Sequence, residues 1–250
     1  MIRAHMATFP ARAPILMQTV ATILPQVDRL CICLNGYDAP PPELADDARI
    51  EWLIPDRDLK DAGKFAFPPA PDDMVFTIDD DILYPPDYVA RTLAMFDILD
   101  PGRDVAGYLG HAWVAKPGAG RHGWRNYMFP KALAHVFKVD VLGTGTACQL
   151  GRNLPEPDRI APAAGFVDLR HARLHVQAGR DLWVLPRPEE YLRDNLPEAM
   201  AESSLFRSVN RRRPAEMQRE LAALMAGRSP GSGQRLEKIR RPERRAEREK

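Results

Sequence analysis

The sequence contains little cysteine and no long apolar run, and each shortage excludes a class of protein. Its 250 residues include three cysteines, too few for the disulfide framework of a small secreted protein. Cys31 and Cys33 alternate on an expected strand and Cys148 stands apart from them, so we expect no cysteine-held zinc site. No stretch approaches the roughly 20 apolar residues that a membrane-spanning helix requires, and residues 1–10 lack the apolar segment of a signal peptide. We therefore expect a cytoplasmic protein.

The formal net charge of +1 conceals an uneven distribution along the chain. Residues 228–250 hold nine Lys and Arg against four Asp and Glu, whereas the residues before them carry a net negative charge. In this tail only Leu236 and Ile239 are sizeable apolar residues, and a stretch rich in Ser, Pro and Gly precedes them. A segment with so little to bury is expected to remain disordered. Its basic charge leaves open a weak peripheral contact with an anionic membrane at the inner face, and we expect no nucleic-acid partner.

Strand-like and helix-like segments alternate along the chain. This alternation is typical of an α/β fold, in which helices cover both faces of a mostly parallel sheet. Strands are expected over residues 2–9, 29–34, 50–54, 74–78, 105–114 and 182–185. Helices are expected over residues 13–24, 87–99, 166–178 and 214–225.

Three adjacent carboxylates follow the apolar strand expected over residues 74–78. They are Asp79, Asp80 and Asp81, and ligands of open α/β sheets bind at the carboxyl ends of the strands. Like charges this close repel one another, so their presence favours a site where a cation compensates them. Carboxylate oxygens suit Mn²⁺ or Mg²⁺, and either ion would bind a diphosphate. The alternative interpretation is a solvated acidic turn that precedes the following helix.

The three aspartates after an apolar strand resemble the DxD motif of GT-A-fold glycosyltransferases, especially the family 2-like bacterial enzymes. Further segments are similar to that family in the same order along the chain: residues 7–12 with 19–26, 28–37, 61–65 and 142–146. The resemblance covers about residues 1–193 and implies a GT-A-like α/β/α sandwich, a Rossmann-like nucleotide-binding fold with a mostly parallel central sheet. It implies one such domain over residues 1–200, a helical C-terminal extension over 201–227, and the basic, disordered tail over 228–250.

The same resemblance implies a hexosyltransferase-type enzyme that moves a sugar from a nucleoside-diphosphate sugar to a glycan or small-molecule acceptor. Mn²⁺ or Mg²⁺ would be held by Asp79 and Asp81, with Asp79 also contacting the ribose or the donor sugar and Asp80 tuning the local charge. Lys64 is suited to a phosphate as a point charge, and its alternative is a solvated surface lysine. The substrate- and nucleotide-binding residues that the resemblance implies are Thr8, Pro10, Arg12, Asn35, Asp61, Lys64, Asp79 and Asp80.

Sugar transfer with inversion also needs a general base that takes the proton of the acceptor hydroxyl. Asp168 lies in an apolar stretch, which would raise its pKa, and the resemblance implies a catalytic acidic residue at this place. A charge at the N-terminus of a helix is the equally supported alternative. The family's Glu-Asp pair and its Gln-x-x-Arg-Trp segment are missing from this chain, so the identity of the base and the stereochemical outcome stay open.

Two other functions remain compatible with these residues. A non-catalytic nucleotide-sugar-binding protein would keep the same fold without turnover. A haloacid-dehalogenase-like phosphohydrolase also has Asp-x-Asp after an apolar strand and binds Mg²⁺, but that family expects Thr or Val where this chain has Leu83.

Two groups of side chains have both functional and structural interpretations. His171 and His175 lie four residues apart on an expected helix, which leaves open a zinc site, an extra ligand for the metal of the acidic cluster, or a plain surface pair. Trp124, Tyr127 and Phe129 form an aromatic cluster that would stack on a sugar ring or pack in the core.

Overall fold

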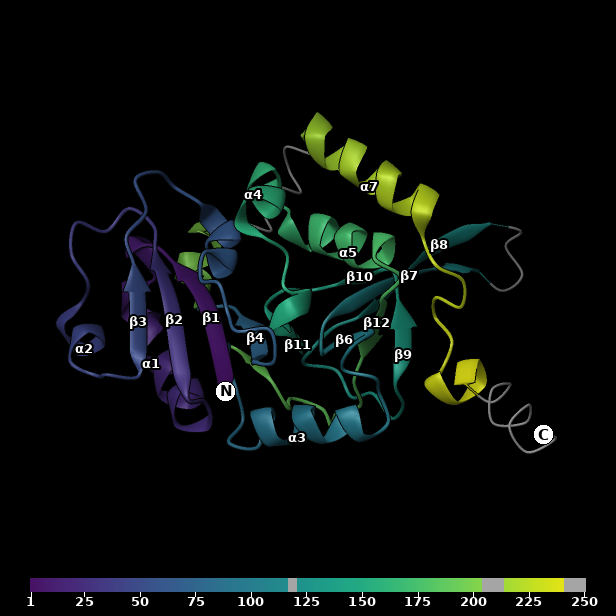
Figure 1. The fold of residues 1–250 in the computed structure, drawn as a ribbon, viewed down its shortest axis with the longest axis horizontal. Coiled ribbons are helices and arrows are strands. Elements are labelled where there is room, and N and C mark those ends of the chain that lie inside the picture. The colour runs from purple at the N-terminus through teal and green to yellow at the C-terminus, as the bar shows by residue number, and fades with distance from the viewer. Residues whose placement is uncertain (117–120, 204–213, 241–250) are drawn as a thin grey trace.

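The computed structural model describes residues 1–116, 121–203 and 214–240, and in these residues a mixed eight-stranded sheet forms the centre of the fold (Figure 1). In their order across the sheet the strands are β3 (Ile50–Leu53), β2 (Arg29–Leu34), β1 (Ile2–Thr8), β4 (Met74–Ile78), β11 (Thr146–Leu150), β6 (Asp104–Gly107), β12 (Asp181–Val184) and β9 (Phe137–Val139). Neighbours from β3 to β4 are parallel, as are β6 and β12. The remaining pairs, which involve β11 and β9, are antiparallel.

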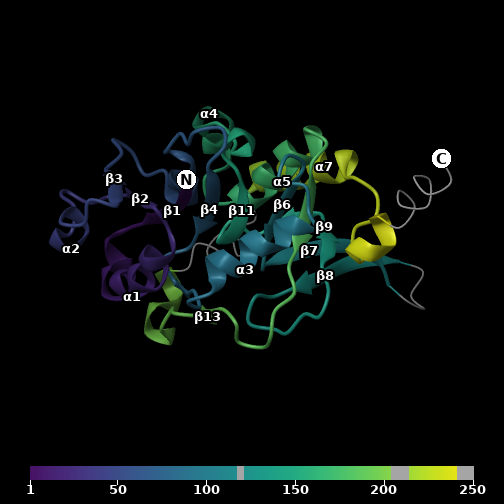
Figure 2. The same cartoon turned by 60° about the horizontal axis from the view of Figure 1, so that its bottom comes forward.

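Helices cover both faces of this sheet, and the views in Figures 1 and 2 agree on their placement. On one face lie α1 (Ala13–Ile23) and α3 (Tyr88–Ala94), whose Leu16 and Tyr88 pack in the largest core cluster with Met6 of β1. On the other face lie α4 (Pro157–Ile160) and α5 (Val167–Gln177), with α7 (Ala215–Gly227) packed on α5. The short α2 (Pro42–Ala45) lies beside β3. This three-layer arrangement around a mostly parallel sheet confirms the predicted α/β fold class.

The single strand expected over residues 105–114 is wrong, because the chain there forms β6 and then β7 (Gly110–Ala115) in a different sheet. β7 pairs with β8 (His122–Tyr127) and β10 (Val141–Leu142). Gly107 and Gly110 stand at the change of direction, where there is no room for a side chain. A Cβ on Gly107 would lie 2.7 Å from the carbonyl oxygen of Thr146, and one on Gly110 would lie 2.5 Å from the Val184 side chain. β6 is buried and β7 is partly buried, so apolar residues continue across the break. Their pattern therefore does not reveal it. A further pair joins β5 (Ile82–Leu83) to β13 (Arg193–Asp194).

The expectation of a disordered tail is wrong for residues 228–240, which fold against the body of the protein. Leu236 is buried within the largest core cluster, and its N–H donates to the carbonyl oxygen of Val136 at 3.0 Å. The Arg240 guanidinium forms an ion pair with buried Asp104 and lies 5.6 Å from the ring of Trp183. Contacts with distant strands thus compensate for ordering a segment that has little of its own to bury. The remaining tail residues, 241–250, lie outside the described part of the chain.

Two further features of the described residues concern the cysteines and the lengths of the helices. The three cysteines are free thiols and all are buried. Among the described helices, none combines the length and the apolar character needed to cross a membrane.

Candidate active site

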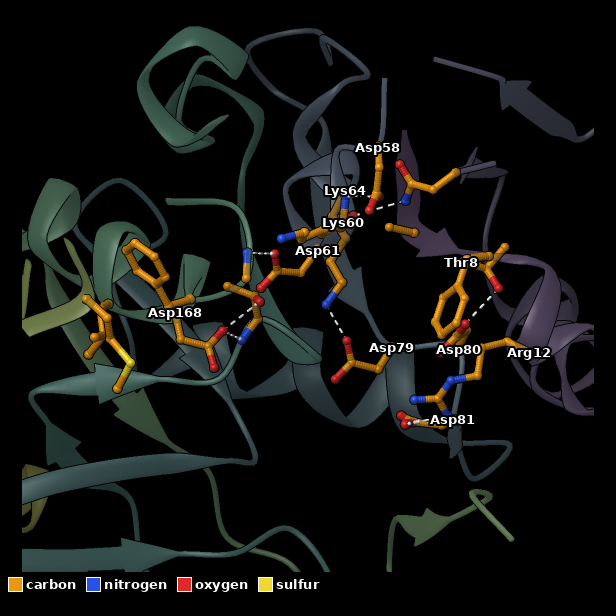
Figure 3. Close-up of a pocket in the computed structure, with 18 of the residues that line it drawn as sticks. Thr8, Arg12, Asp58, Lys60, Asp61, Lys64, Asp79, Asp80, Asp81 and Asp168 are labelled. Carbon is orange, nitrogen blue, oxygen red and sulfur yellow. Dashed lines mark hydrogen bonds and ion pairs between the residues drawn. The ribbon is translucent and has the colours of Figure 1, made fainter. Parts of the chain in front are cut away.

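A cavity of about 850 Å³ opens at the carboxyl ends of β1, β2 and β4 (Figure 3). Its volume lies within the range of about 300–1,000 Å³ that is usual for small-molecule sites. The residues that the resemblance implies for substrate, metal or catalysis all line this cavity: Thr8, Pro10, Arg12, Asn35, Asp61, Lys64, Asp79, Asp80, Asp81 and Asp168. The tertiary structure therefore brings together residues that are up to 160 positions apart in the sequence.

Parallel pairing of the strands explains why the N-terminal part of this set converges. Thr8 of β1 is in register with Leu34 of β2, and Met6 of β1 is in register with Ile78 of β4. The residues that follow these strand ends meet at the same edge of the sheet. Asn35 and Asp79 are the first residues after β2 and β4, so their side chains reach one cavity.

Asp79 forms an ion pair with Lys64, which belongs to a 3₁₀ helix (Lys60–Phe65) packed on β1 and β2. The Lys64 side chain is only 4% exposed, whereas that of Asp79 is 36% exposed. Burial lowers the pKa of Lys64, but the neighbouring carboxylates of Asp79, Asp168 and Asp61 outweigh burial and raise this pKa above its ordinary value. Lys64 is therefore a buried, charged ammonium at the cavity wall, and the interpretation of a solvated surface lysine is wrong.

Asp80 and Asp81 have partners on the other side of the acidic cluster. Thr8 Oγ1 donates to Asp80 Oδ2 at 2.6 Å, and Arg12 forms an ion pair with Asp81 at 2.9 Å (Figure 3). Burial raises the pKa of Asp80 to about 6, although Arg12 and the Thr8 hydroxyl oppose the shift. Burial, together with the charges of Asp79 and Asp80, also raises the pKa of Asp81. The cluster is thus enclosed and bonded within the protein, which rules out a freely solvated acidic turn.

Asn35 holds the loop that leads into the 3₁₀ helix. Its Oδ1 accepts from the N–H of Leu59 at 2.8 Å, and its Nδ2 donates to the carbonyl oxygen of Lys60 at 3.1 Å. Lys60 has a φ of +51°, a left-handed conformation that non-glycine residues rarely adopt. Asp58 also accepts from the Lys60 N–H at 2.8 Å. Asn35 and Asp58 thus stabilise a strained turn at the cavity edge.

Asp61 connects the 3₁₀ helix to the start of α5. Its carboxylate accepts from the backbone N–H of Gly165 at 2.5 Å and from that of Val167 at 3.4 Å. Burial raises the pKa of Asp61 to about 6, and these backbone donors and Lys64 limit the shift. The position of Asp61 in the cavity therefore also fixes where α5 begins.

Asp168 lies in the first turn of α5 and lines the same cavity, so both sequence interpretations describe its location. Its Oδ1 accepts from the N–H of Thr144 at 2.9 Å and from Thr144 Oγ1 at 2.7 Å. Within the described residues, both hydrogen bonds recorded for Asp168 end on Oδ1. The carboxylate is held in one orientation by Thr144, which lies in the segment over residues 142–146.

The residues that the sequence interpretation did not assign to the site are mostly apolar. Trp124 was considered for sugar stacking and does line the cavity, whereas Tyr127 packs on Phe137 and Phe129 packs against the largest core cluster. No motif marked the other apolar side chains of the lining, which are Val141, Phe166, Leu169, Met217 and Leu221. Met217 and Leu221 are four residues apart, a spacing that indicates one face of a helix.

His171 and His175 are buried between α5 and the sheet, so the interpretation of a surface pair is wrong. Their Nε2 atoms are 3.0 Å apart, and His171 Nε2 lies 3.2 Å from the side-chain oxygen of Gln149. Burial lowers the pKa of His171 to about 3, with Lys64 adding to the shift. Neither histidine lines the cavity, and the pair is a neutral buried network at pH 7.

The donor set of the acidic cluster is compatible with a divalent cation. No group of three or more His, Cys, Asp or Glu side chains in the described residues is arranged as a ready metal site. Mg²⁺ needs no such group, because it binds through one or two carboxylates while water and substrate phosphates complete its shell. Asp79 and Asp81 supply oxygens of the required type at the cavity wall, and a cation would compete there with Lys64 and Arg12.

The sequence matches no protein-family model and no curated protein. Among solved structures, the fold is similar to S. aureus TarS 1-349, with a TM-score of 0.49 and 12% identity over 90% of this chain and 70% of that one. It is also similar to 4-diphosphocytidyl-2C-methyl-D-erythritol synthase, with a TM-score of 0.47 and 10% identity over 82% of this chain and 96% of that one. A197 from STIV gives a TM-score of 0.37 and 16% identity over 66% of this chain and 83% of that one. At these values the activity has to be inferred from the site itself.

Proposed function

We propose that this protein is a glycosyltransferase that moves a sugar from a nucleoside-diphosphate sugar to a hydroxyl acceptor. The observation that carries the proposal is one cavity in which an acidic cluster, two buried cations and a separately held carboxylate meet. Lys64 and Arg12 lie at the end that would receive the diphosphate, and Asp168 lies on the opposite side from Asp80 and Asp81 (Figure 3). Buried cations stabilise negative charge strongly because little water screens them.

The reaction would join the acceptor oxygen to the anomeric carbon while the bond from that carbon to the diphosphate oxygen breaks. The electron pair of the broken bond leaves with the diphosphate, where Lys64 and Arg12 stabilise the developing charge. Asp168 would take the proton of the acceptor hydroxyl as a general base, since its hydrogen bonds with Thr144 fix its orientation. A Mn²⁺ or Mg²⁺ ion held by Asp79 and Asp81 would add positive charge at the diphosphate.

The alternative of a non-catalytic nucleotide-sugar-binding protein draws support from one observation. Asp79 and Asp81 already have cationic partners within the chain, so the cluster is compensated without any ligand. The phosphohydrolase alternative gains no comparable support.

A thermal-shift screen of uridine, guanosine, cytidine and adenosine diphosphates, each with and without Mn²⁺, tests the proposal. Ligands that bind the folded state raise the melting temperature by mass action, so we expect one base to stabilise the protein more with Mn²⁺ than without it. The corresponding nucleotide sugars are then assayed for release of the nucleoside diphosphate in the presence of acceptors. Binding without release would favour the non-catalytic alternative, and the absence of stabilisation by every nucleotide would contradict both.

A further inference from the structure

The lining of the cavity changes from charged to apolar along its length. We call Thr8, Arg12, Lys64 and Asp79–Asp81 the polar end. The apolar end consists of Val141, Phe166, Leu169, Met217 and Leu221, and the polar side chains of His111, Asn126, Thr144 and Glu202 also line the cavity outside the polar end. Asp168 stands between them, since it lies within three residues of Phe166 and Leu169 in the sequence and faces the polar end across the cavity (Figure 3).

Val141 of the apolar end belongs to a buried core cluster, whereas the other four side chains present apolar surface to the cavity. Phe166, Leu169, Met217 and Leu221 are each only partly buried, and all four line the cavity. Leu224, one turn further along α7, is fully buried. An apolar surface kept open inside a concave site is typical of a place where a ligand buries an apolar group.

The helix that contributes Met217 and Leu221 is held in place by a buried charge. Glu220 of α7 accepts from Nε of Arg170 at 2.8 Å and also pairs with Arg173, both on α5, and its side chain is 7% exposed. The contact fixes α7 on α5, and α5 also packs against β10, which carries Val141. The apolar surface is therefore largely formed before a ligand arrives, which reduces the entropy lost on binding.

We propose that the apolar end is the acceptor subsite and that the acceptor carries its reactive hydroxyl on an amphipathic molecule with an apolar group. This inference rests on the proposed glycosyl transfer. The hydroxyl has to reach Asp168, which lies next to Leu169 on α5 and two residues after Phe166, and all three residues line the cavity. The rest of the acceptor then extends away from the charged donor end, over Met217 and Leu221. A bare sugar would leave these apolar side chains facing polar hydroxyls.

Calorimetric titration with octyl β-glucoside and methyl β-glucoside, both below the micelle concentration, tests the subsite because the two probes carry the same hydroxyls. We expect the octyl compound to bind at least about tenfold more tightly, since burying two or three methylene groups is enough for such a gain. Equal binding of both probes by the unaltered protein would overturn the proposal.

Met217→Gln and Leu221→Gln keep side-chain size roughly constant while removing apolar character. Each is expected to weaken octyl glucoside binding several-fold and to leave the affinity for the nucleoside diphosphate unchanged. Met225→Gln is the matched control, because Met225 lies on the same helix, is partly buried and is not a lining residue. An equal loss in the Met225 variant would contradict a specific subsite. A loss of nucleoside diphosphate affinity in the Met217 and Leu221 variants would assign the surface to the donor base instead.

The same titrations separate this inference from the proposed function. Tight octyl glucoside binding by a protein that binds no nucleoside diphosphate would overturn both glycosyl transfer and the acceptor role. Nucleoside diphosphate binding with no preference for the octyl probe would leave the transferase intact and remove the apolar acceptor.

Discussion

At the polar end of the cavity, Thr8 and the three aspartates stand at the ends of the neighbouring parallel strands β1 and β4, whereas the apolar end is formed by segments that are distant in the chain. β1, β2 and β4 bring Thr8, Asn35 and Asp79 to one edge through their shared register. Val141, Leu169 and Leu221 meet only because β10, α5 and α7 pack together. One end is thus set by sheet topology and the other by the packing of separate elements.

The two ends also differ in how their side chains are fixed. In the polar end Asp79, Asp80 and Asp81 each have a partner in Lys64, Thr8 or Arg12. In the apolar end no directional bond orients the lining, and the surface depends on how α7 is held on α5. The polar end is suited to recognise one charged group, and the apolar end tolerates variation in the group it receives.

Asp168→Asn tests the residue between the two ends and carries the largest expected effect. The asparagine oxygen can still accept from Thr144, so binding of nucleoside diphosphate should be unchanged. Loss of the base should reduce sugar transfer by a factor of about 10² or more, measured as kcat with saturating donor. Asp158→Asn, on exposed α4 surface, is the control. Near-normal turnover of the Asp168 variant would remove this carboxylate from the mechanism.

Leu236→Ala tests whether the C-terminal half depends on residues from the end of the chain. Because Leu236 is buried in the main core, the free energy of unfolding should fall by about 2–5 kcal/mol. Chemical denaturation measures this change, with exposed Lys238→Ala as the control. Identical unfolding of both variants and the unaltered protein would mean that residues 228–240 are not folded against the body.

Lys64→Met tests the charge of the polar end. Lys64 faces the cavity and neutralises Asp79, so its loss should weaken nucleoside diphosphate binding about tenfold or more, as removal of a charged hydrogen-bond donor does. Lys131→Met, at an exposed lysine paired with Glu189, should bind normally. Calorimetry gives both affinities, and unchanged binding by the Lys64 variant would place the diphosphate elsewhere.

His171→Gln tests whether the buried histidine pair, which does not line the charged cavity, is neutral in the folded protein. The pKa of folded His171 is about 3 and that of an unfolded histidine is about 6.5. The unfolded chain therefore binds the extra proton between these values, and stability present above pH 6.5 is lost as the pH falls. His171 contributes about 1.4 kcal/mol per pH unit over this range, and glutamine, which keeps a nitrogen near the Nε2 position, does not titrate.

The variant should therefore lose stability less steeply than the unaltered protein between pH 6 and pH 4.5. Asp61, whose pKa is raised to about 6, acts in the opposite direction but is present in both proteins, so it cancels in the comparison. Denaturation at several pH values measures both slopes. Equal slopes would mean that His171 is already protonated in the folded protein.

Particular residues explain where prediction from the sequence succeeded and failed. β4 over residues 74–78 has the predicted bounds because carboxylates frame its apolar run on both sides in the sequence. The break between β6 and β7 was missed because it depends on contacts of Gly107 and Gly110 with residues far along the chain. Leu236 was assigned to a disordered tail because its own segment offers no core, whereas other strands supply one.

Among the site residues, some positions could also be predicted from the sequence and others could not. The strand-end positions of Thr8 and Asp79 could be predicted, since parallel neighbours end at one edge. The burial of Lys64, and the bonds of Asn35 with Leu59 and Lys60, could not be predicted because they depend on how the 3₁₀ helix packs on β1 and β2.

By itself the sequence determined the alternation of strands and helices, the acidic cluster at a strand end and the set of polar residues that meet there. Local apolar periodicity and strand direction are enough to decide these features. The tertiary structure alone decided which carboxylate pairs with which cation, that residues 228–240 join the core, and that α7 brings Met217 and Leu221 to the cavity that Asp168 lines. These depend on side chains meeting across long stretches of chain, and burial changes both the pKa of a group and the strength of its interactions only once those contacts exist.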